Sequence, residues 1–178
     1  MPDTTQATLL EEDGRAALRF ERILTHPPDR VWRALTERAE LTAWHPTPFE
    51  LEPVLGAPIR FQPPASVPDW PEGRVTACEP PRLLAHTWGE DSLRWELEPH
   101  PEGSRLTLTH SFDDRFKAAR DAAGWELCLA ALMASLDGVA PPPAAGPDEV
   151  PPGWRELNSD YERRFGIAPE HATPPPGA

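Results

Sequence analysis

The fold is decided by one stretch of sequence, SRLTLTHSFDDRFKAARDAAGWELCLAALMASLDG (residues 104–138). Its first part alternates leucines with threonines, and this period of two predicts a half-buried strand. Asp113-Asp114 interrupts the alternation. Residues 115–136 then contain no proline and carry apolar side chains at helical spacing. We therefore predict a long amphipathic helix directly after the last strand of a sheet, ended by Gly138.

Similar alternation recurs before that stretch. It predicts strands at residues 15–24, 49–51, 59–61, 73–79, 83–88 and 93–98, which precede the strand at 106–112. Short spacing with turn residues between strands is typical of antiparallel pairing. His26-Pro27-Pro28-Asp29 begins a short helix, because proline fits the first turn and aspartate suits its positive end. Thr36 is placed to cap a second short helix. The prediction is an α+β fold: a curved antiparallel β-sheet wrapped around a long C-terminal α-helix, with two short helices after the first strand.

The chain divides into one domain and its tails. We expect residues 1–14 to be disordered or frayed and residues 15–138 to form the domain. Residues 139–153 are a proline-rich linker without packing capacity. Residues 154–166 carry apolar side chains at roughly helical spacing, which predicts a short helical tail. Residues 167–178 are expected to be disordered because they are too poor in apolar residues to pack.

The charge and the cysteines exclude several classes of function. The chain has 17 basic and 29 acidic residues, a formal charge of −12. Such a surface repels phosphate backbones and anionic lipid, so neither a nucleic acid nor a membrane is expected as a partner. Cys78 and Cys128 form no CxxC pair, which excludes a thiolate zinc finger and a disulfide scaffold. Residues 1–13 lack a secretory signal, so a cytoplasmic protein with reduced thiols is expected.

A sheet curved around one helix leaves a cleft, and such clefts are common ligand sites. Tryptophan rings around a cleft can stack on a flat apolar ligand. The residues expected to line it are Trp44, Phe49, Phe61, His86, Trp88, Trp95, His110, Trp125, Leu129 and Leu132. Most of Trp95 and Trp125 is expected to fill the core. Trp44 ends a predicted helix and Trp88 ends a predicted strand. For these two residues a position at the cavity rim and a position in the core are left open as alternatives.

Three histidines accompany these rings. His86 and His110 share a parity with apolar neighbours in their strands, so both should face the same side of the sheet as Trp95. A neutral, hydrogen-bonded core histidine is the favoured interpretation, with a general base as the alternative. His45, beside Trp44, is expected to have a surface role. We expect no metal or cofactor, and without a nucleophile motif we assign no catalytic residue.

Several segments carry a family resemblance. They are FER (20–22) with HPPDRVWRALT (26–36), LTAW (41–44), PPRLL (80–84) leading to TW (87–88), RLTLTH (105–110), and GW through LDG (124–138). Together they resemble the START-like (SRPBCC) superfamily, in the branch named after the activator of the heat-shock-protein-90 ATPase. The resemblance covers about residues 15–138 and implies a helix-grip, Bet v-like fold with an internal cavity. It does not specify an activity, because this fold hosts many functions.

The favoured function is reversible binding of a hydrophobic or aromatic small molecule between the sheet and the long helix. The first alternative is an enzyme of the polyketide cyclase or hydrolase type, as in some START-like members. Such chemistry calls for an inward arginine or tyrosine, and the sequence offers no good candidate. The second alternative is a chaperone-associated interaction module. The eukaryotic activator has a separate N-terminal domain that residues 1–14 cannot supply, so we expect this alternative to be wrong. The oligomeric state is left open.

Overall fold

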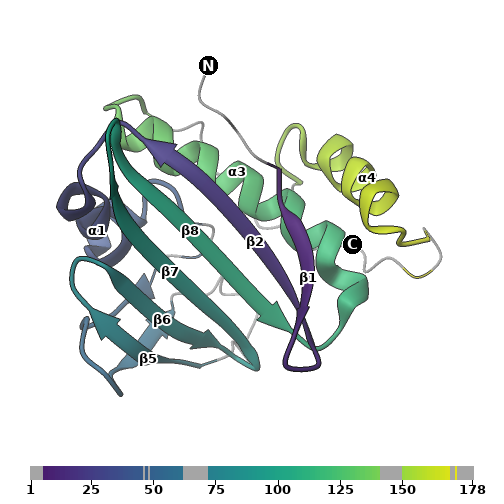
Figure 1. Cartoon of the computed structure of the whole chain (residues 1–178), viewed down its shortest axis with the longest axis horizontal. Coiled ribbons are helices and arrows are strands. Elements are labelled where there is room, and N and C mark those ends of the chain that lie inside the picture. Colours follow the sequence, from purple (N-terminus) through teal and green to yellow (C-terminus); the bar gives the residue numbers. More distant parts are fainter. Residues whose placement is uncertain are drawn as a thin grey trace.

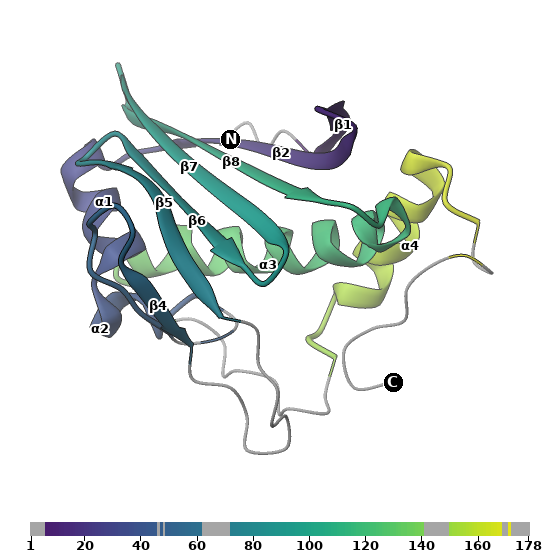
Figure 2. The ribbon, with the colours of Figure 1, turned by 90° about the horizontal axis from the view of Figure 1, so that it is seen from below.

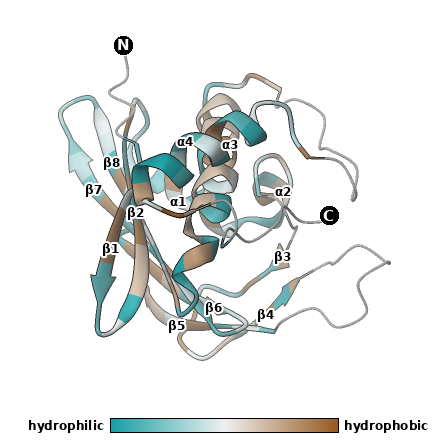
Figure 3. Ribbon diagram, turned by 90° about the vertical axis from the view of Figure 1, so that its right-hand side faces the viewer, coloured by the Kyte–Doolittle hydropathy of each residue, from teal (hydrophilic) through white to brown (hydrophobic). Residues whose placement is uncertain are grey.

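The backbone forms one antiparallel sheet with its helices gathered on a single side (Figures 1 and 3). This computed structural model describes residues 6–45, 47, 49–61, 72–140, 150–168 and 171. The strands are β1 (Thr8–Glu12), β2 (Arg15–Leu24), β3 (Phe49–Glu50), β4 (Pro58–Phe61), β5 (Gly73–Glu79), β6 (Leu83–Trp88), β7 (Asp91–His100) and β8 (Gly103–Phe112). The helices are α1 (Pro28–Thr36), α2 (Arg38–Leu41), the 3-10 turn η1 (Arg115–Lys117), α3 (Ala118–Leu136) and α4 (Trp154–Phe165).

The strand order is β1-β2-β8-β7-β6-β5-β4-β3, and every neighbouring pair is antiparallel. Figure 2 shows the sheet arching over α3, which runs beneath the strands. Side chains that alternate inward along the strands pack against one stripe of α3 and form the core. The predicted α+β helix-grip fold is therefore confirmed, including the two short helices after the long strand β2.

The start of the long helix follows from its residues. The Asp114 carboxylate accepts a hydrogen bond from the Phe116 backbone N–H at 3.0 Å, which caps the first turn as a 3-10 turn. The α-helical part begins at Ala118. In contrast, Thr36 does not cap the second short helix as expected. Its hydroxyl donates to the Trp32 carbonyl, closing α1, and α2 begins after Glu37 without a side-chain cap.

The N-terminal segment, expected to be frayed or disordered, instead forms the edge strand β1 over Thr8–Glu12. Ala7, just before it, is fully buried and donates its backbone N–H to the Tyr161 hydroxyl at 2.9 Å. Leu9 packs against the core as well. Pairing with β2 and the contact with α4 supply the burial that the sequence of this segment alone does not indicate.

The tail helix α4 occupies the range expected for it and packs against α3 of its own chain. Its Trp154 and Tyr161 are buried, and Ile167, in the segment expected to be disordered, is only 4% exposed. The central part of the expected linker and most of the segment after Ile167 lie outside the described residues. Among the described helices, none has the length and apolar character needed to cross a membrane.

Candidate functional site

Aromatic rings from several elements meet between the sheet and α3. We call this group the aromatic cluster; its members are Trp44, His45, Phe49, Phe61, His86, Trp88, Trp95, His110 and Trp125. The ring centroids of Trp95 lie 5.7 Å from Trp44 and 5.5 Å from Trp125. The cluster therefore joins the short helices, the sheet and the long helix through contacting rings.

All eight ring-bearing residues predicted for the cleft belong to this cluster. The other two predicted residues, Leu129 and Leu132, are buried on α3 in the same core. Contacting rings occupy the space between sheet and helix, so a ligand has to separate some of them. That these residues line a ligand pocket stays a prediction.

The indole N–H groups show which tryptophans are fixed in the core. Trp44 donates to the Ala34 carbonyl at 2.9 Å and is only 5% exposed, so it is a core residue and not a rim residue. Trp88 is half-buried and stacks on the half-buried ring of Phe61, with centroids 5.3 Å apart and an interplanar angle of 18°. The cluster thus has a closed end at Trp44 and a partly exposed end at the Phe61–Trp88 pair.

His86 and His110 face the interior, as predicted. Both are paired across their strands with Leu93, whose side chain lies on the same face as that of Trp95. His86 accepts a hydrogen bond from the Trp95 indole at Nε2 (3.4 Å), and its Nδ1 donates to the Thr87 carbonyl (3.2 Å). Burial lowers the pKa of His86 to about 4. This histidine is therefore neutral at pH 7, with both ring nitrogens engaged.

His110 joins the cluster to a charged group at its edge. Its Nδ1 accepts from the Trp125 indole at 3.1 Å, and its Nε2 donates to Asp91 at 2.9 Å. The Lys117 ammonium also donates to the same Asp91 oxygen, at 2.5 Å. Burial alone would raise the pKa of the Asp91 carboxyl, but the hydrogen bonds from His110 and Lys117 outweigh it and hold this pKa below its usual value.

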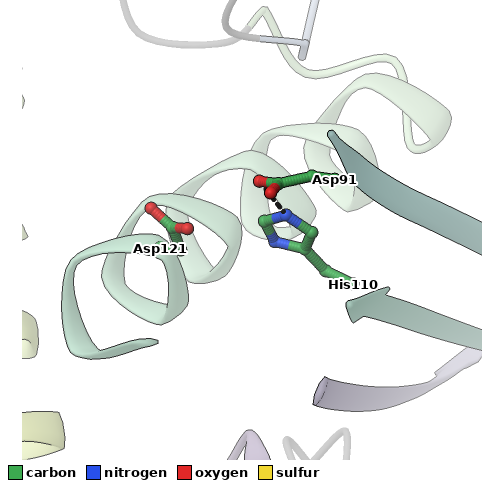
Figure 4. Close-up of side chains that lie close together, drawn as sticks. All are labelled: Asp91, His110 and Asp121. Atoms are coloured by element: carbon green, nitrogen blue, oxygen red, sulfur yellow. Dashed lines mark hydrogen bonds and ion pairs between the residues drawn. The ribbon is translucent and has the colours of Figure 1, made fainter. Parts of the chain in front are cut away.

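Asp91, His110 and Asp121 also form the one group within the described residues whose donor atoms could surround a metal ion (Figure 4). Their ligand atoms all lie within 4.8 Å of one another. The Lys117 ammonium lies 2.5 Å from Asp91 and 3.9 Å from Asp121, and Arg120 donates to Asp121 at 2.8 Å. Two protein cations thus already balance these carboxylates, and a metal ion would have to displace Lys117.

His45 is the cluster residue that sequence reasoning placed wrongly. The structure buries it, with 6% of its surface exposed, against the rings of Phe49, Trp88 and Trp125. Burial lowers its pKa to about 3, so it is neutral at pH 7. The residue follows the short helix α2 in an irregular segment, where no periodicity indicates which way a side chain points.

A buried ionic group was also missed. The Arg22 guanidinium pairs with Glu126 at 2.6 Å, and the Tyr161 hydroxyl donates to the other Glu126 oxygen at 2.5 Å. An inward arginine and a buried tyrosine, which the sequence did not offer for cyclase chemistry, are therefore present. Both are engaged by Glu126, and they join β2, α3 and α4.

Burial makes both cysteine thiols harder to ionise. Both are free, and burial raises the pKa of each thiol, that of Cys128 to about 12.

An open groove of about 740 Å³ lies outside the cluster. It is lined by residues of β1 and by Arg115, Arg164 and Phe165.

A curved antiparallel sheet closed over a long helix, with a largely aromatic interior, defines a helix-grip protein of the START-like (SRPBCC) superfamily. The chain belongs to the family described as Activator of Hsp90 ATPase homolog 1-like protein, whose model matches residues 25–137. The resemblance seen in the sequence is therefore confirmed. No curated protein matches the chain.

Solved structures of several bacterial proteins are similar to this chain. The protein encoded by gene BPP1335 of Bordetella parapertussis is 31% identical, with a TM-score of 0.67 over 92% of this chain and 91% of that one. EF2215 of Enterococcus faecalis, described as a conserved protein of unknown function, is 24% identical, with a TM-score of 0.69 over 90% of each chain. CalU16 of Micromonospora echinospora is 18% identical, with a TM-score of 0.71 over 97% of each chain, and supports the fold alone.

Proposed function

We propose that this protein reversibly binds a small hydrophobic or aromatic molecule in the aromatic cluster, between the sheet and α3. The observation that carries the proposal is the Phe61–Trp88 pair, which is stacked, half-buried and continuous with the buried rings behind it. Each aromatic pair contributes only about 0.5–1.5 kcal/mol beyond its burial. A flat ligand that slides between two rings restores the same kind of contact that it breaks, so insertion costs little.

The contrast between the two ends of the cluster supports an entry route at Phe61–Trp88. Trp44 is held by a hydrogen bond to a helix carbonyl and is 5% exposed. Trp95 and Trp125 are likewise buried and donate to His86 and His110. Moving these three deeper tryptophans breaks their hydrogen bonds to Ala34, His86 and His110, whereas the half-buried Phe61–Trp88 pair lies at the more exposed end of the cluster.

The test uses N-phenyl-1-naphthylamine, a neutral flat fluorophore whose emission rises in an apolar environment. Binding in the micromolar range, about −8 kcal/mol, is expected for such a non-cognate probe. Trp88→Ala should weaken this binding by about tenfold, because the large indole contact with the ligand is lost. Trp154→Ala removes the same side chain from α4, outside the cluster, and should lower stability without changing affinity.

The urea midpoint of each variant, followed by tryptophan emission, separates stability from binding. Absence of probe binding to the wild-type protein would reject the proposed function. Unchanged affinity in Trp88→Ala would reject the Phe61–Trp88 end as the entry.

A further inference from the structure

His45 carries an unpaired polar atom inside the aromatic cluster. Its Nε2 is buried, and no described residue supplies a hydrogen-bond partner for it. His86 and His110 differ, because both ring nitrogens of each are hydrogen-bonded. A buried polar atom without a partner is costly and uncommon in folded proteins. The His45 Nε2 therefore calls for a specific explanation.

The other ring nitrogen determines what Nε2 can do. The His45 Nδ1 lies 2.8 Å from the Thr47 carbonyl oxygen and 3.2 Å from the Thr47 backbone nitrogen. A proton on Nδ1 makes the shorter contact a hydrogen bond, whereas a lone pair there would face the carbonyl oxygen at 2.8 Å. The Thr47 backbone N–H is placed to donate to Nδ1 in the other tautomer, but the carbonyl contact is the shorter one and favours the tautomer with the proton on Nδ1. The Nε2 of a neutral imidazole is then a hydrogen-bond acceptor.

The surroundings of His45 restrict the chemistry of a partner. The rings of Trp44, Phe49, Trp88 and Trp125 lie 4.7–5.9 Å from the imidazole, centroid to centroid. Such walls favour a planar aromatic body. Bringing an anion into this apolar site would also be costly, since the His45 imidazole is neutral and the chain carries a formal charge of −12.

We propose that His45 is the polar anchor of the site and that the ligand is a neutral, planar aromatic molecule bearing a hydroxyl group, which donates its hydrogen bond to His45 Nε2. This inference rests on the proposed function and specifies its ligand class. A phenolic hydroxyl is attached directly to the ring that the aromatic walls hold, so the donor and the flat body arrive together. The ligand satisfies the atom that the described side chains leave unpaired.

The experiment measures displacement of N-phenyl-1-naphthylamine by two matched competitors, 2-naphthol and 2-methoxynaphthalene. They share the naphthalene body, but only 2-naphthol can donate a hydrogen bond. The readout is the ratio of the dissociation constant of 2-methoxynaphthalene to that of 2-naphthol. Since a net hydrogen bond to a buried acceptor is worth about tenfold in affinity, His45→Phe should lower this ratio about tenfold. His100→Phe, the same substitution in the β7–β8 hairpin, should leave it unchanged.

A second measurement needs no variant. Nitrogen-15 NMR of the histidine side chains in the wild-type protein should show the His45 Nε2 as unprotonated, and its resonance should shift with 2-naphthol but not with 2-methoxynaphthalene. A protonated Nε2, or equal ratios in wild type and His45→Phe, would overturn the inference while probe binding itself still stands. Failure of the fluorophore to bind the wild-type protein would instead reject the proposed function.

Discussion

Arg22 and Glu126 form an ion pair that is almost completely removed from water, and its loss should be costly. The two side chains are 3% and 11% exposed, and their charged atoms lie 2.6 Å apart. Arg22→Met keeps much of the apolar stem of the side chain. It leaves the Glu126 carboxylate buried without the arginine's charge, and the Tyr161 hydroxyl still donates to it. Removing one partner of a buried pair costs about 3–5 kcal/mol, and we expect that loss here.

The assay is urea unfolding followed by tryptophan emission, with linear extrapolation to water. The matched control is Arg94→Met. Arg94 pairs with Glu96 at 3.0 Å, but the two side chains are 46% and 35% exposed, so its loss should cost less than about 1 kcal/mol. A double variant, Arg22→Met with Glu126→Leu, should recover part of the lost stability because no uncompensated charge remains. Equal losses in Arg22→Met and Arg94→Met would refute the reasoning.

Three further predictions concern acidity, backbone and thiol reactivity. Burial lowers the pKa of His45 and His86 from 6.5 to about 3 and about 4, so the unfolded chain binds more protons and stability should fall as pH drops from about 6.5 towards 4. The unfolding free energy should fall by at most about 1.4 kcal/mol per pH unit for each histidine. In His45→Phe, measured by urea unfolding at several pH values, the unfolding free energy should depend less steeply on pH. Gly124→Ala, in an uncrowded place on α3, should raise the unfolding free energy by about 1 kcal/mol. Gly103→Ala, at φ +143° and with the added Cβ 2.3 Å from a backbone oxygen, should lower it by more than about 2 kcal/mol; a loss in Gly124→Ala or a gain in Gly103→Ala would contradict the respective prediction. Cys128 is half-buried and burial raises the pKa of its thiol to about 12, so it should react only slowly with Ellman's reagent in the native protein; native labelling as fast as in urea would contradict this.

Periodic segments made the fold predictable. Apolar and polar side chains alternate along β7 and β8, and α3 follows directly in the sequence. Parity alone then places His86, Trp95 and His110 on one face of the sheet, and the structure agrees. Parity works because successive side chains of a strand point to opposite faces of the sheet. The same parity brings Trp95 and His110 into contact with Trp125 on the facing stripe of α3.

Contacts between distant segments were not predictable in the same way. Ala7 is buried because Tyr161, 154 positions later, accepts its N–H, and no local pattern links the two. Arg22 has the parity of an inward residue, but a charged side chain in a strand is usually exposed, and its partner Glu126 lies on another element. His45 has no periodicity to set its direction. Each of these residues is placed by tertiary contacts and not by local propensity.

The three histidines of the aromatic cluster differ in function because their ring nitrogens differ in partners. Both ring nitrogens of His86 are hydrogen-bonded, one to the Trp95 indole and the other to the backbone of β6. Both ring nitrogens of His110 link Trp125 to Asp91, and through Asp91 to the Lys117 ammonium, so this buried indole is connected to a charged group. These bonds hold the walls of the cluster in fixed positions. His45 uses one nitrogen to fix its own ring and keeps a lone pair on the other, which is what a binding group requires: a rigid ring with an acceptor still available to the ligand.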